Sequence, residues 1–136
     1  MIVRDIMSPG VTTVTQDDTA FKAATLMKNH NIGAIPVMCG KKVCGMVTDR
    51  DIVLRCIASG KDANECKIGE VMTGSAVTVT PDRQVSDAAS IMASEQLRRL
   101  PVVENGELTG IVSLSDIARQ RQSTEVSKAL CEISMP

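Results

Sequence analysis

The feature that most constrains this 136-residue chain is an internal repeat with a spacing of 65 residues. Residues 5–53 align with residues 70–118 without a gap, and 14 of the 49 aligned positions are identical. A duplicated structural unit explains a gap-free match of this length. Because a unit of about 50 residues buries little core by itself, we expect the two copies to bury equivalent faces against each other.

Each repeat predicts the same order of elements, β-α-β-β-α. β-branched residues indicate a first strand at Val11–Thr15 and at Ala76–Thr80. A helix follows, then a strand that contains proline, a hairpin turn, a return strand and a helix that begins near Asp49 or Leu114. Since proline donates no backbone hydrogen bond, the proline strands should be edges, or bonded on one side only at that residue. The predicted helical faces are Ala20, Ala23, Ala24 and Met27 in the first repeat, and Val85, Ala88, Ala89 and Met92 in the second. The predicted return strands are Val43–Val47 and Leu108–Val112.

These patterns predict an α/β (α+β) fold of two β-α-β-β-α units packed with pseudo-twofold symmetry, with paired clefts between the halves. The predicted boundaries are 1–60 and 70–122 for the two repeats, with a polar linker at 61–69. Residues 123–136 are predicted to form a C-terminal helical tail, because Val126, Leu130 and Ile133 recur at helical spacing.

Composition argues against several classes of function. The chain has no Trp or Tyr, one Phe, a net charge of −1 and no long basic run, which disfavours nucleic-acid binding. No apolar stretch is long enough to span a membrane, and the charged N-terminus does not resemble a signal peptide, so a cytoplasmic location is expected. No nucleophile–base pair is visible, and the single histidine, His30, lies near a helix end, so we do not expect an enzyme.

The five cysteines, Cys39, Cys44, Cys56, Cys66 and Cys131, are spaced irregularly. An odd and irregular set does not indicate a disulfide framework, so we expect small, reduced and partly buried side chains. Cys39 and Cys44 could form one half of a C-x4-C metal site, but no second pair matches it, and no bound metal is expected. A redox or metal-sensing role of the cysteines is a further alternative.

The segments "GMVTDRDI" and "GIVSLSDI" occupy equivalent places in the repeats. Thr48-x-x-Asp51 and Ser113-x-x-Asp116 have the form of a helix capping box, in which hydroxyl and carboxylate each accept a backbone hydrogen bond. The same residues suit a ligand. A carboxylate can accept from two neighbouring hydroxyls, and a hydroxyl at a helix N-terminus lies beside N–H groups that favour anions. The two interpretations are compatible.

The order of motifs resembles a tandem pair of CBS domains, the Bateman module. The motifs are an M-[ST] opening, a V-T-V-T strand, an A-A-x-x-M helix, an h-P-V strand and G-h-V-[TS]-x-x-D-I, and they cover nearly the whole chain. The resemblance implies a regulatory module that binds AMP, ADP, ATP, NAD or S-adenosylmethionine, requires no cofactor, forms a homodimer and transmits ligand occupancy to an effector protein. The alternative is a ligand-independent dimeric interaction or scaffold protein.

The resemblance also implies two ligand sites. The motif aspartate contacts ribose, its Thr or Ser contacts ribose or phosphate, the h-P-h segment holds adenine, and residues leading into the first strand of the opposite repeat complete each site. Because Arg98 and Arg99 replace Gly33 and Ala34, the second site should suit phosphate better, and the first should take a less charged ligand or stay empty. One set is Thr48, Arg50, Asp51, Ala34, Ile35, Pro36, Ser75, Ala76 and Val77; the other is Ser113, Asp116, Arg98, Arg99, Leu100, Pro101, Gly10, Val11 and Thr12.

Overall fold

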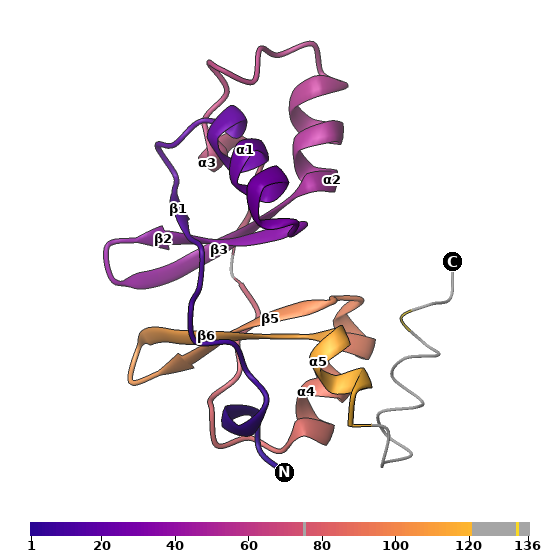
Figure 1. Cartoon of the computed structure of the whole chain (residues 1–136). Coiled ribbons are helices and arrows are strands. Elements are labelled where there is room, and N and C mark those ends of the chain that lie inside the picture. The colour runs from indigo at the N-terminus through magenta and orange to yellow at the C-terminus, as the bar shows by residue number, and fades with distance from the viewer. Residues whose placement is uncertain (75, 121–132, 134–136) are drawn as a thin grey trace. The chain divides into compact units, whose positions relative to one another are not determined.

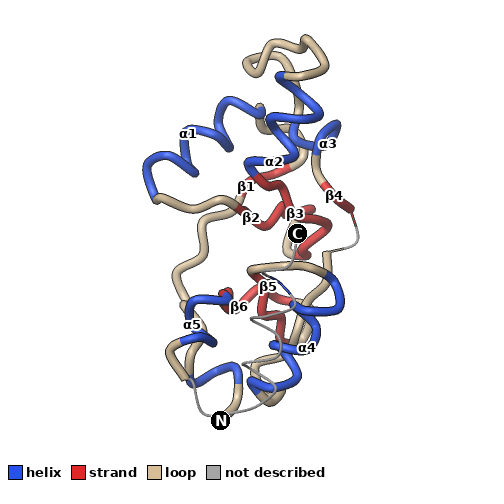
Figure 2. The backbone as a smooth tube through the Cα atoms, turned by 90° about the vertical axis from the view of Figure 1, so that its right-hand side faces the viewer, coloured by secondary structure: helices blue, strands red, loops and turns tan. Residues whose placement is uncertain are grey.

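The computed structural model describes residues 1–74, 76–120 and 133. The chain divides into two compact units: a continuous unit, Thr12–Ala76, and a split unit, which combines Met1–Val11 with Val77–Pro136. The predicted α/β class is confirmed, since each unit carries helices on one face of a β-sheet (Figures 1 and 2). The predicted helical tail over 123–136 lies outside the described residues except for Ile133, which is buried in the core of the split unit.

The continuous unit has a four-stranded sheet in the order β1-β2-β3-β4. Helices α1 and α2 lie on the same side of this sheet in both views (Figures 1 and 2). Its core gathers the apolar faces of the helices and of the two central strands around Ile35, Val37 and Val47, which are fully buried. The elements are β1 Val14–Thr15, α1 Ala20–His30, β2 Ala34–Cys39, β3 Lys42–Thr48, α2 Asp49–Ile52, the π-helix η2 Val53–Ile57, α3 Ile68–Val71 and β4 Thr73–Gly74.

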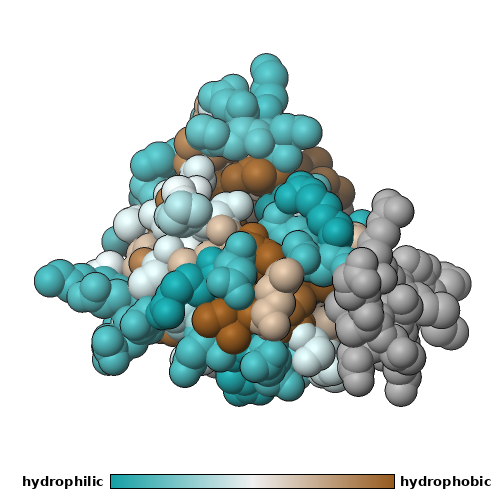
Figure 3. All heavy atoms as spheres, turned by 60° about the horizontal axis from the view of Figure 1, so that its bottom comes forward, coloured by the Kyte–Doolittle hydropathy of each residue, from teal (hydrophilic) through white to brown (hydrophobic). Residues whose placement is uncertain are grey.

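The split unit repeats this plan with a two-stranded antiparallel sheet. Its core includes Val3 from the N-terminal segment together with Met92, Leu100 and Ile117 from the second repeat. On the face that Figure 3 brings forward, hydrophilic residues surround smaller groups of hydrophobic ones, as on ordinary protein surfaces. The elements are η1 Val3–Asp5, α4 Val85–Glu95, β5 Arg99–Glu104, β6 Glu107–Ser113 and α5 Leu114–Ala118. No helix among the described residues has the length and apolarity needed to cross a bilayer.

Each proline strand has a backbone neighbour on both sides, β1 and β3 for β2, and Val79 and β6 for β5. β2 lies between β1 and β3, but β1 pairs only with Val37 and Met38, so Pro36 pairs with β3 alone. The strand predicted at Val11–Thr15 is reduced to β1. The strand predicted at Ala76–Thr80 is reduced to a single bridge between Val79 and Val102. The prediction of one-sided bonding is wrong at Pro101, which pairs with Ile111 of β6 while its carbonyl oxygen accepts from the Val79 N–H on the other side at 3.1 Å.

The predicted helical faces are confirmed except at Ala24. The α4 face is wholly buried, as predicted, whereas α1 buries only Ala20, Ala23 and Met27. Ala24 is exposed, so its placement in the core was wrong. It lies about 100° farther round the helix than Ala23, outside the narrower buried stripe of α1.

Each repeat begins with an opening segment, residues 1–11 in the first repeat and the equivalent stretch from residue 66 in the second. The opening segment of the first repeat packs in the unit of the second repeat, and that of the second repeat packs in the unit of the first. Each opening donates to, and accepts from, the backbone that flanks the long helix of the other repeat. Three of these backbone hydrogen bonds in one unit have an equivalent in the other. The N–H groups of Val3, Arg4 and Val85 bond to the carbonyl oxygens of Arg83, Pro81 and Met1 at 2.9, 2.9 and 3.0 Å, and those of Ile68, Gly69 and Ala20 bond to Asp18, Gln16 and Cys66 at 2.8, 3.0 and 2.8 Å.

The spatial units therefore differ from the predicted repeat boundaries. The first eleven residues belong with the second repeat, whereas the sequence predicts a domain at 1–60 that contains them. The end of the segment predicted as a linker is also part of a core, because Cys66 and Ile68 are buried in the continuous unit. These segments have to reach the other repeat because their apolar residues complete its core.

Two glycines at equivalent places let the exchanged openings approach the sheets. A Cβ on Gly110 would lie 2.8 Å from the Met7 sulfur and 3.0 Å from the Ser8 carbonyl oxygen. A Cβ on Gly45 would overlap the carbonyl oxygen of Thr73. Glycine at both places is thus explained by close backbone approach rather than by an unusual φ angle.

Candidate functional site

Both capping boxes are present. The Thr48 hydroxyl accepts from the Asp51 N–H at 3.1 Å, and Asp51 Oδ2 accepts from the Thr48 N–H at 3.0 Å. The Ser113 hydroxyl and Asp116 make the same pair of bonds at 3.1 and 2.9 Å. The structural interpretation of the motif is therefore confirmed, and it fixes both the hydroxyl and one carboxylate oxygen at the start of α2 and of α5.

The second carboxylate oxygen of each motif lies beside an arginine. Asp51 Oδ1 is 3.8 Å from Arg55 Nη1, and Asp116 Oδ1 is 3.2 Å from Arg119 Nη1. The aspartate side chains are 13% and 12% exposed, whereas those of the arginines are 53% and 72% exposed. Each motif thus presents an anchored carboxylate. Among the residues that the structure describes, its Oδ1 makes no backbone hydrogen bond and could accept from further donors.

Sequence reasoning missed these two arginines. Arg55 also donates to the carbonyl oxygens of Val71 and Met72 at 3.0 and 3.3 Å, so it ties the motif helix to the exchanged opening segment. Arginine three or four residues after aspartate on a helix is the signal that could have found them.

The h-P-h segments lie next to the motifs, as predicted. Ala34 pairs with Thr48 across the sheet, and Arg99 pairs with Ser113. The residue after each motif hydroxyl also bonds to the residue that precedes the h-P-h strand. The Asp49 N–H donates to the Gly33 carbonyl oxygen at 3.0 Å, and the Leu114 N–H donates to the Arg98 carbonyl oxygen at 2.7 Å. The remaining members of the two segments, Ile35, Pro36, Leu100 and Pro101, are buried.

Three of the six opening residues in the predicted sets lie in the same unit as the motif of their set. Gly10 and Val11 belong to the split unit with Ser113 and Asp116, and Ala76 belongs to the continuous unit with Thr48 and Asp51. The backbone just before them pairs with the site strand, Ser8 with Ile111 and Thr73 with Met46. Thr12 and Val77 fall in the unit opposite to their sets, and Ser75 lies outside the described residues.

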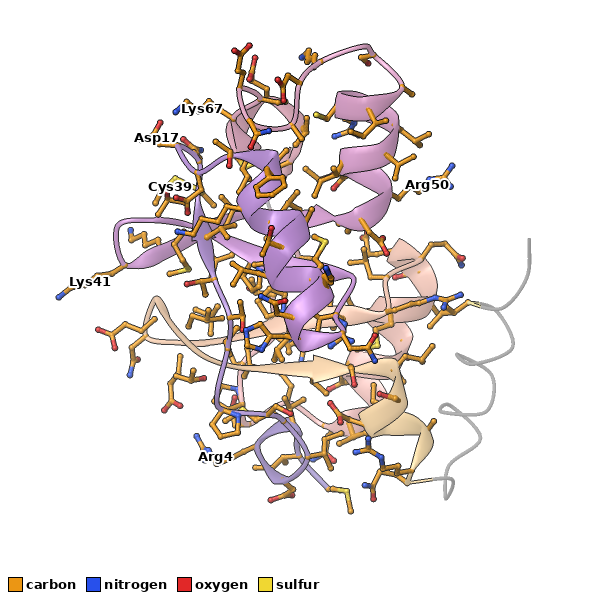
Figure 4. All side chains as sticks on the ribbon, turned by 45° about the horizontal axis from the view of Figure 1, so that its top comes forward. Arg4, Asp17, Cys39, Lys41, Arg50 and Lys67 are labelled. Carbon is orange, nitrogen blue, oxygen red and sulfur yellow. A yellow bond between two sulfur atoms is a disulfide. The ribbon has the colours of Figure 1, made fainter. Side chains whose placement is uncertain are left out.

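The two motifs differ in charge. Around the first lie two acids and two arginines, Asp49, Asp51, Arg50 and Arg55; around the second lie one acid and three arginines, Asp116, Arg98, Arg99 and Arg119. The Asp49 carboxylate lies against Gly33, where a Cβ would be 3.1 Å from Oδ2, whereas the second repeat has Leu114 and Arg98 there. Arg50 points away from its helix into open space (Figure 4).

The cysteine prediction is wrong for one pair. Cys39 and Cys44 are joined by a disulfide in the β2–β3 hairpin, so they are neither reduced nor available as a C-x4-C metal pair. Their spacing of five residues places them together because a tight turn and a bulge lie between the strands. Within the described part of the chain, no three His, Cys, Asp or Glu side chains are grouped so that they could hold a metal ion.

Comparison with known proteins identifies the family. The model of the CBS domain family matches residues 3–57 and 68–123, one match for each repeat. The chain belongs to the CBS domain family. The resemblance seen in the ordered motifs is thus confirmed, together with the tandem arrangement.

Several proteins are similar to this CBS pair over most of its length. The CBS domain-containing protein YhcV of Bacillus subtilis is 44% identical over 133 residues, 97% of this chain and 94% of YhcV. The solved structure of Hypoxic Response Protein I with two coordinated zinc ions, a protein of Mycobacterium tuberculosis, is 38% identical and covers 88% of this chain and 98% of that one, with a TM-score of 0.81. The CBS domain pair of protein MJ0100, solved with 5-methylthioadenosine and S-adenosyl-L-methionine, is 30% identical with a TM-score of 0.79, covering 88% of this chain and 94% of that one.

Proposed function

We propose that this CBS pair is a non-catalytic regulatory module that binds adenosine-containing ligands at its two capping motifs and transmits their occupancy to an effector protein. The observation that supports this proposal most strongly is the fixed position of the aspartate carboxylate in each motif. One oxygen of Asp51 or Asp116 is used by the cap, and the other lies beside an arginine at the edge of the h-P-h strand. Such a carboxylate can accept from both hydroxyls of a ribose without losing its position.

The recognition has three parts. Asp116 takes the ribose hydroxyls, and the adenine is assigned to the backbone of the h-P-h segment, because the side chains of Leu100 and Pro101 are buried in the core. The guanidinium groups of Arg98, Arg99 and Arg119 are the donors for phosphate, because planar forks suit phosphate oxygens. We therefore assign AMP, ADP or ATP to the split unit.

The continuous unit is proposed to favour a less charged ligand. Its motif has as many acids as arginines, and Asp49 lies where a phosphate-binding arginine would have to reach. S-adenosylmethionine or methylthioadenosine fits this site better than ATP does. The MJ0100 pair, solved with both of these ligands, supports their choice as candidate ligands for a CBS pair.

A thermal-shift screen tests this proposal. AMP, ADP, ATP, NAD, S-adenosylmethionine and methylthioadenosine are added separately to the purified chain, with GMP and CMP as controls. A ligand at a hundred times its Kd stabilises the folded state by about 2.7 kcal/mol, which raises Tm by several degrees. We expect that rise with at least one adenosine ligand and none with CMP; unchanged Tm with every adenosine ligand at millimolar concentration contradicts the proposal.

A second feature favours dimerisation as part of this function. Val53, Leu54 and Ile57 of η2 are 54%, 48% and 56% exposed, which is unusual for three large apolar side chains on five consecutive residues. Covering such a face in a symmetric dimer removes it from water. We propose that the chain forms a homodimer through η2.

The Leu54→Glu variant tests the dimer. A carboxylate in the middle of the covered face has to be desolvated, so we expect the dimer to dissociate to monomer in sedimentation velocity. Ser90→Glu adds the same charge at an exposed place on α4 and should leave the dimer intact. A wild-type chain that sediments as a monomer at tens of micromolar, or a Leu54→Glu chain that stays dimeric, sinks the proposal.

A further inference from the structure

The Cys39–Cys44 disulfide spans the end of the β2–β3 hairpin. Val37 pairs with Gly45 and Met38 pairs with Val43, so Cys44 is the extra residue of a β-bulge. Cys39 is the last residue of β2 and pairs with Lys42. The bulge and the turn together bring the two Cα atoms to 5.7 Å, within the usual range for a disulfide.

The second repeat shows that the hairpin does not need this bond. β5 and β6 have the same register and the same bulge, where Val102 pairs with Gly110 and Val103 pairs with Leu108. Glu104 and Thr109 occupy the places of the two cysteines. Because turn and bulge form without a covalent link there, the first hairpin is expected to keep its conformation when the disulfide is reduced.

The second repeat also shows where a reduced Cys44 thiol would go. The Thr109 hydroxyl donates to the carbonyl oxygen of Val102 at 3.2 Å. Cys44 Sγ lies 3.4 Å from the carbonyl oxygen of Val37, the equivalent acceptor. A thiol formed by reduction therefore has a hydrogen-bond acceptor in place, so both redox states are accommodated by one backbone.

The pair is accessible, in contrast to the other described cysteines. Cys39 is exposed and Cys44 half-buried, and the turn between them carries the exposed Lys41 and Lys42. Lys41 projects from the hairpin tip into open space (Figure 4). Positive charge close to a thiol favours the reactive thiolate.

Cys56 and Cys66 are buried instead. Burial raises the pKa of the Cys66 thiol, and the Cys56 thiol beside it adds to the rise. The low reactivity expected of these two buried thiols therefore serves as a control for the reactivity of Cys39 and Cys44.

We propose that Cys39 and Cys44 form a reversible dithiol–disulfide site, an oxidation-sensitive position in the hairpin of the continuous unit. In the oxidising direction, one cysteine thiolate attacks a glutathione disulfide and releases one glutathione; the other cysteine then attacks the mixed disulfide, closes the Cys39–Cys44 bond and releases the second. Two protein thiols are oxidised and one glutathione disulfide is reduced to two glutathione molecules. A dithiol reagent reverses the reaction.

This site is separate from the proposed ligand motif. Cys39 and Ala34 are the two ends of β2, and five residues of strand span about 16 Å. The redox site therefore does not depend on ligand binding, and the two proposals can fail independently.

The experiment equilibrates the folded chain in glutathione buffers of increasing oxidising strength, blocks free thiols with N-ethylmaleimide and digests with trypsin. Cleavage after Lys41 and Lys42 separates the peptides 29–41 and 43–50, so only the disulfide holds Cys39 and Cys44 together. We expect the ratio of linked to blocked peptides to rise tenfold for each tenfold rise in the ratio of glutathione disulfide to the square of glutathione, which corresponds to about 30 mV. Cys56 and Cys66 should be blocked only after denaturation.

Two variants and one physical measurement complete the test. Cys131→Ser should leave the amount of linked peptides unchanged. Cys44→Ser should abolish the linked peptides, while its far-UV circular dichroism spectrum stays that of the wild-type chain. A disulfide that a dithiol reagent cannot reduce in the folded chain, a linkage of either cysteine to Cys131, or a bond that never forms in oxidising buffer overturns the proposal.

Discussion

Replacing Gly45 by alanine is expected to lower the free energy of unfolding by about 3 kcal/mol, the upper end of the cost of overpacking. The added Cβ would overlap the carbonyl oxygen of Thr73 and would lie 3.3 Å from the Met72 sulfur. The methionine can move aside, but Thr73 is held in β4 by its pairing with Met46 of β3. Urea denaturation followed by circular dichroism measures the loss as a lower midpoint with an unchanged m-value.

Gly74→Ala is the matched control. Gly74 is the register partner of Gly45, yet a Cβ placed on it meets no atom within 4 Å. The same chemical change one strand away should therefore alter the free energy of unfolding by less than about 1 kcal/mol. Equal effects of the two substitutions would show that Gly45 does not mark a close approach of the exchanged segment.

The Asp116→Asn variant is expected to weaken AMP binding about 100-fold, or near 2.7 kcal/mol. Asparagine keeps one oxygen that can accept from the Ser113 N–H, so the cap of α5 survives. Its amide group replaces Oδ1, the oxygen beside Arg119, and an NH₂ group cannot accept from ribose hydroxyls. Calorimetric titration of both proteins with AMP gives the two dissociation constants.

Asp51→Asn separates the two motifs. The same change in the continuous unit should leave AMP affinity within about twofold, because the proposal assigns phosphate to the arginine-rich split unit. Far-UV circular dichroism of both variants checks that the helices are retained. The assignment fails if Asp51→Asn weakens AMP as strongly as Asp116→Asn, or if neither substitution changes the affinity.

Much of the fold follows from local patterns in the sequence. The alternation and turn residues around Gly40 and Gly106 predicted both hairpins, and the small apolar face predicted α4 in full. The capping boxes at Thr48 and Ser113 were also predictable, because their geometry depends only on residues three apart.

The exchange of the opening segments could not be predicted. Val3 and Ile68 are both apolar and occupy equivalent places, so each could fill the core of either repeat. Local sequence patterns are satisfied equally well whether an opening segment packs on its own repeat or on the other one. Only the three-dimensional path of the chain decides between these two arrangements. The same holds for Cys39 and Cys44, whose pairing depends on a bulge that spacing alone does not reveal.

The charge difference between the motifs was partly visible in the sequence. The aligned sequence already shows Arg98 and Arg99 in the second repeat where the first repeat has Gly33 and Ala34. The ion pair of Arg119 with Asp116 and the position of the Asp49 carboxylate against Gly33 depend on side-chain placement that the sequence does not reveal.

Calorimetric titration of the unmodified chain with AMP tests the central claim most directly. We expect saturable binding with a Kd below about 1 mM, equivalent to more than about 4 kcal/mol of binding free energy. ATP should displace the bound AMP, and CMP should not. A folded chain that gives no binding heat with AMP, ADP, ATP or S-adenosylmethionine at millimolar concentration, and no Tm change with any of them, would contradict this claim.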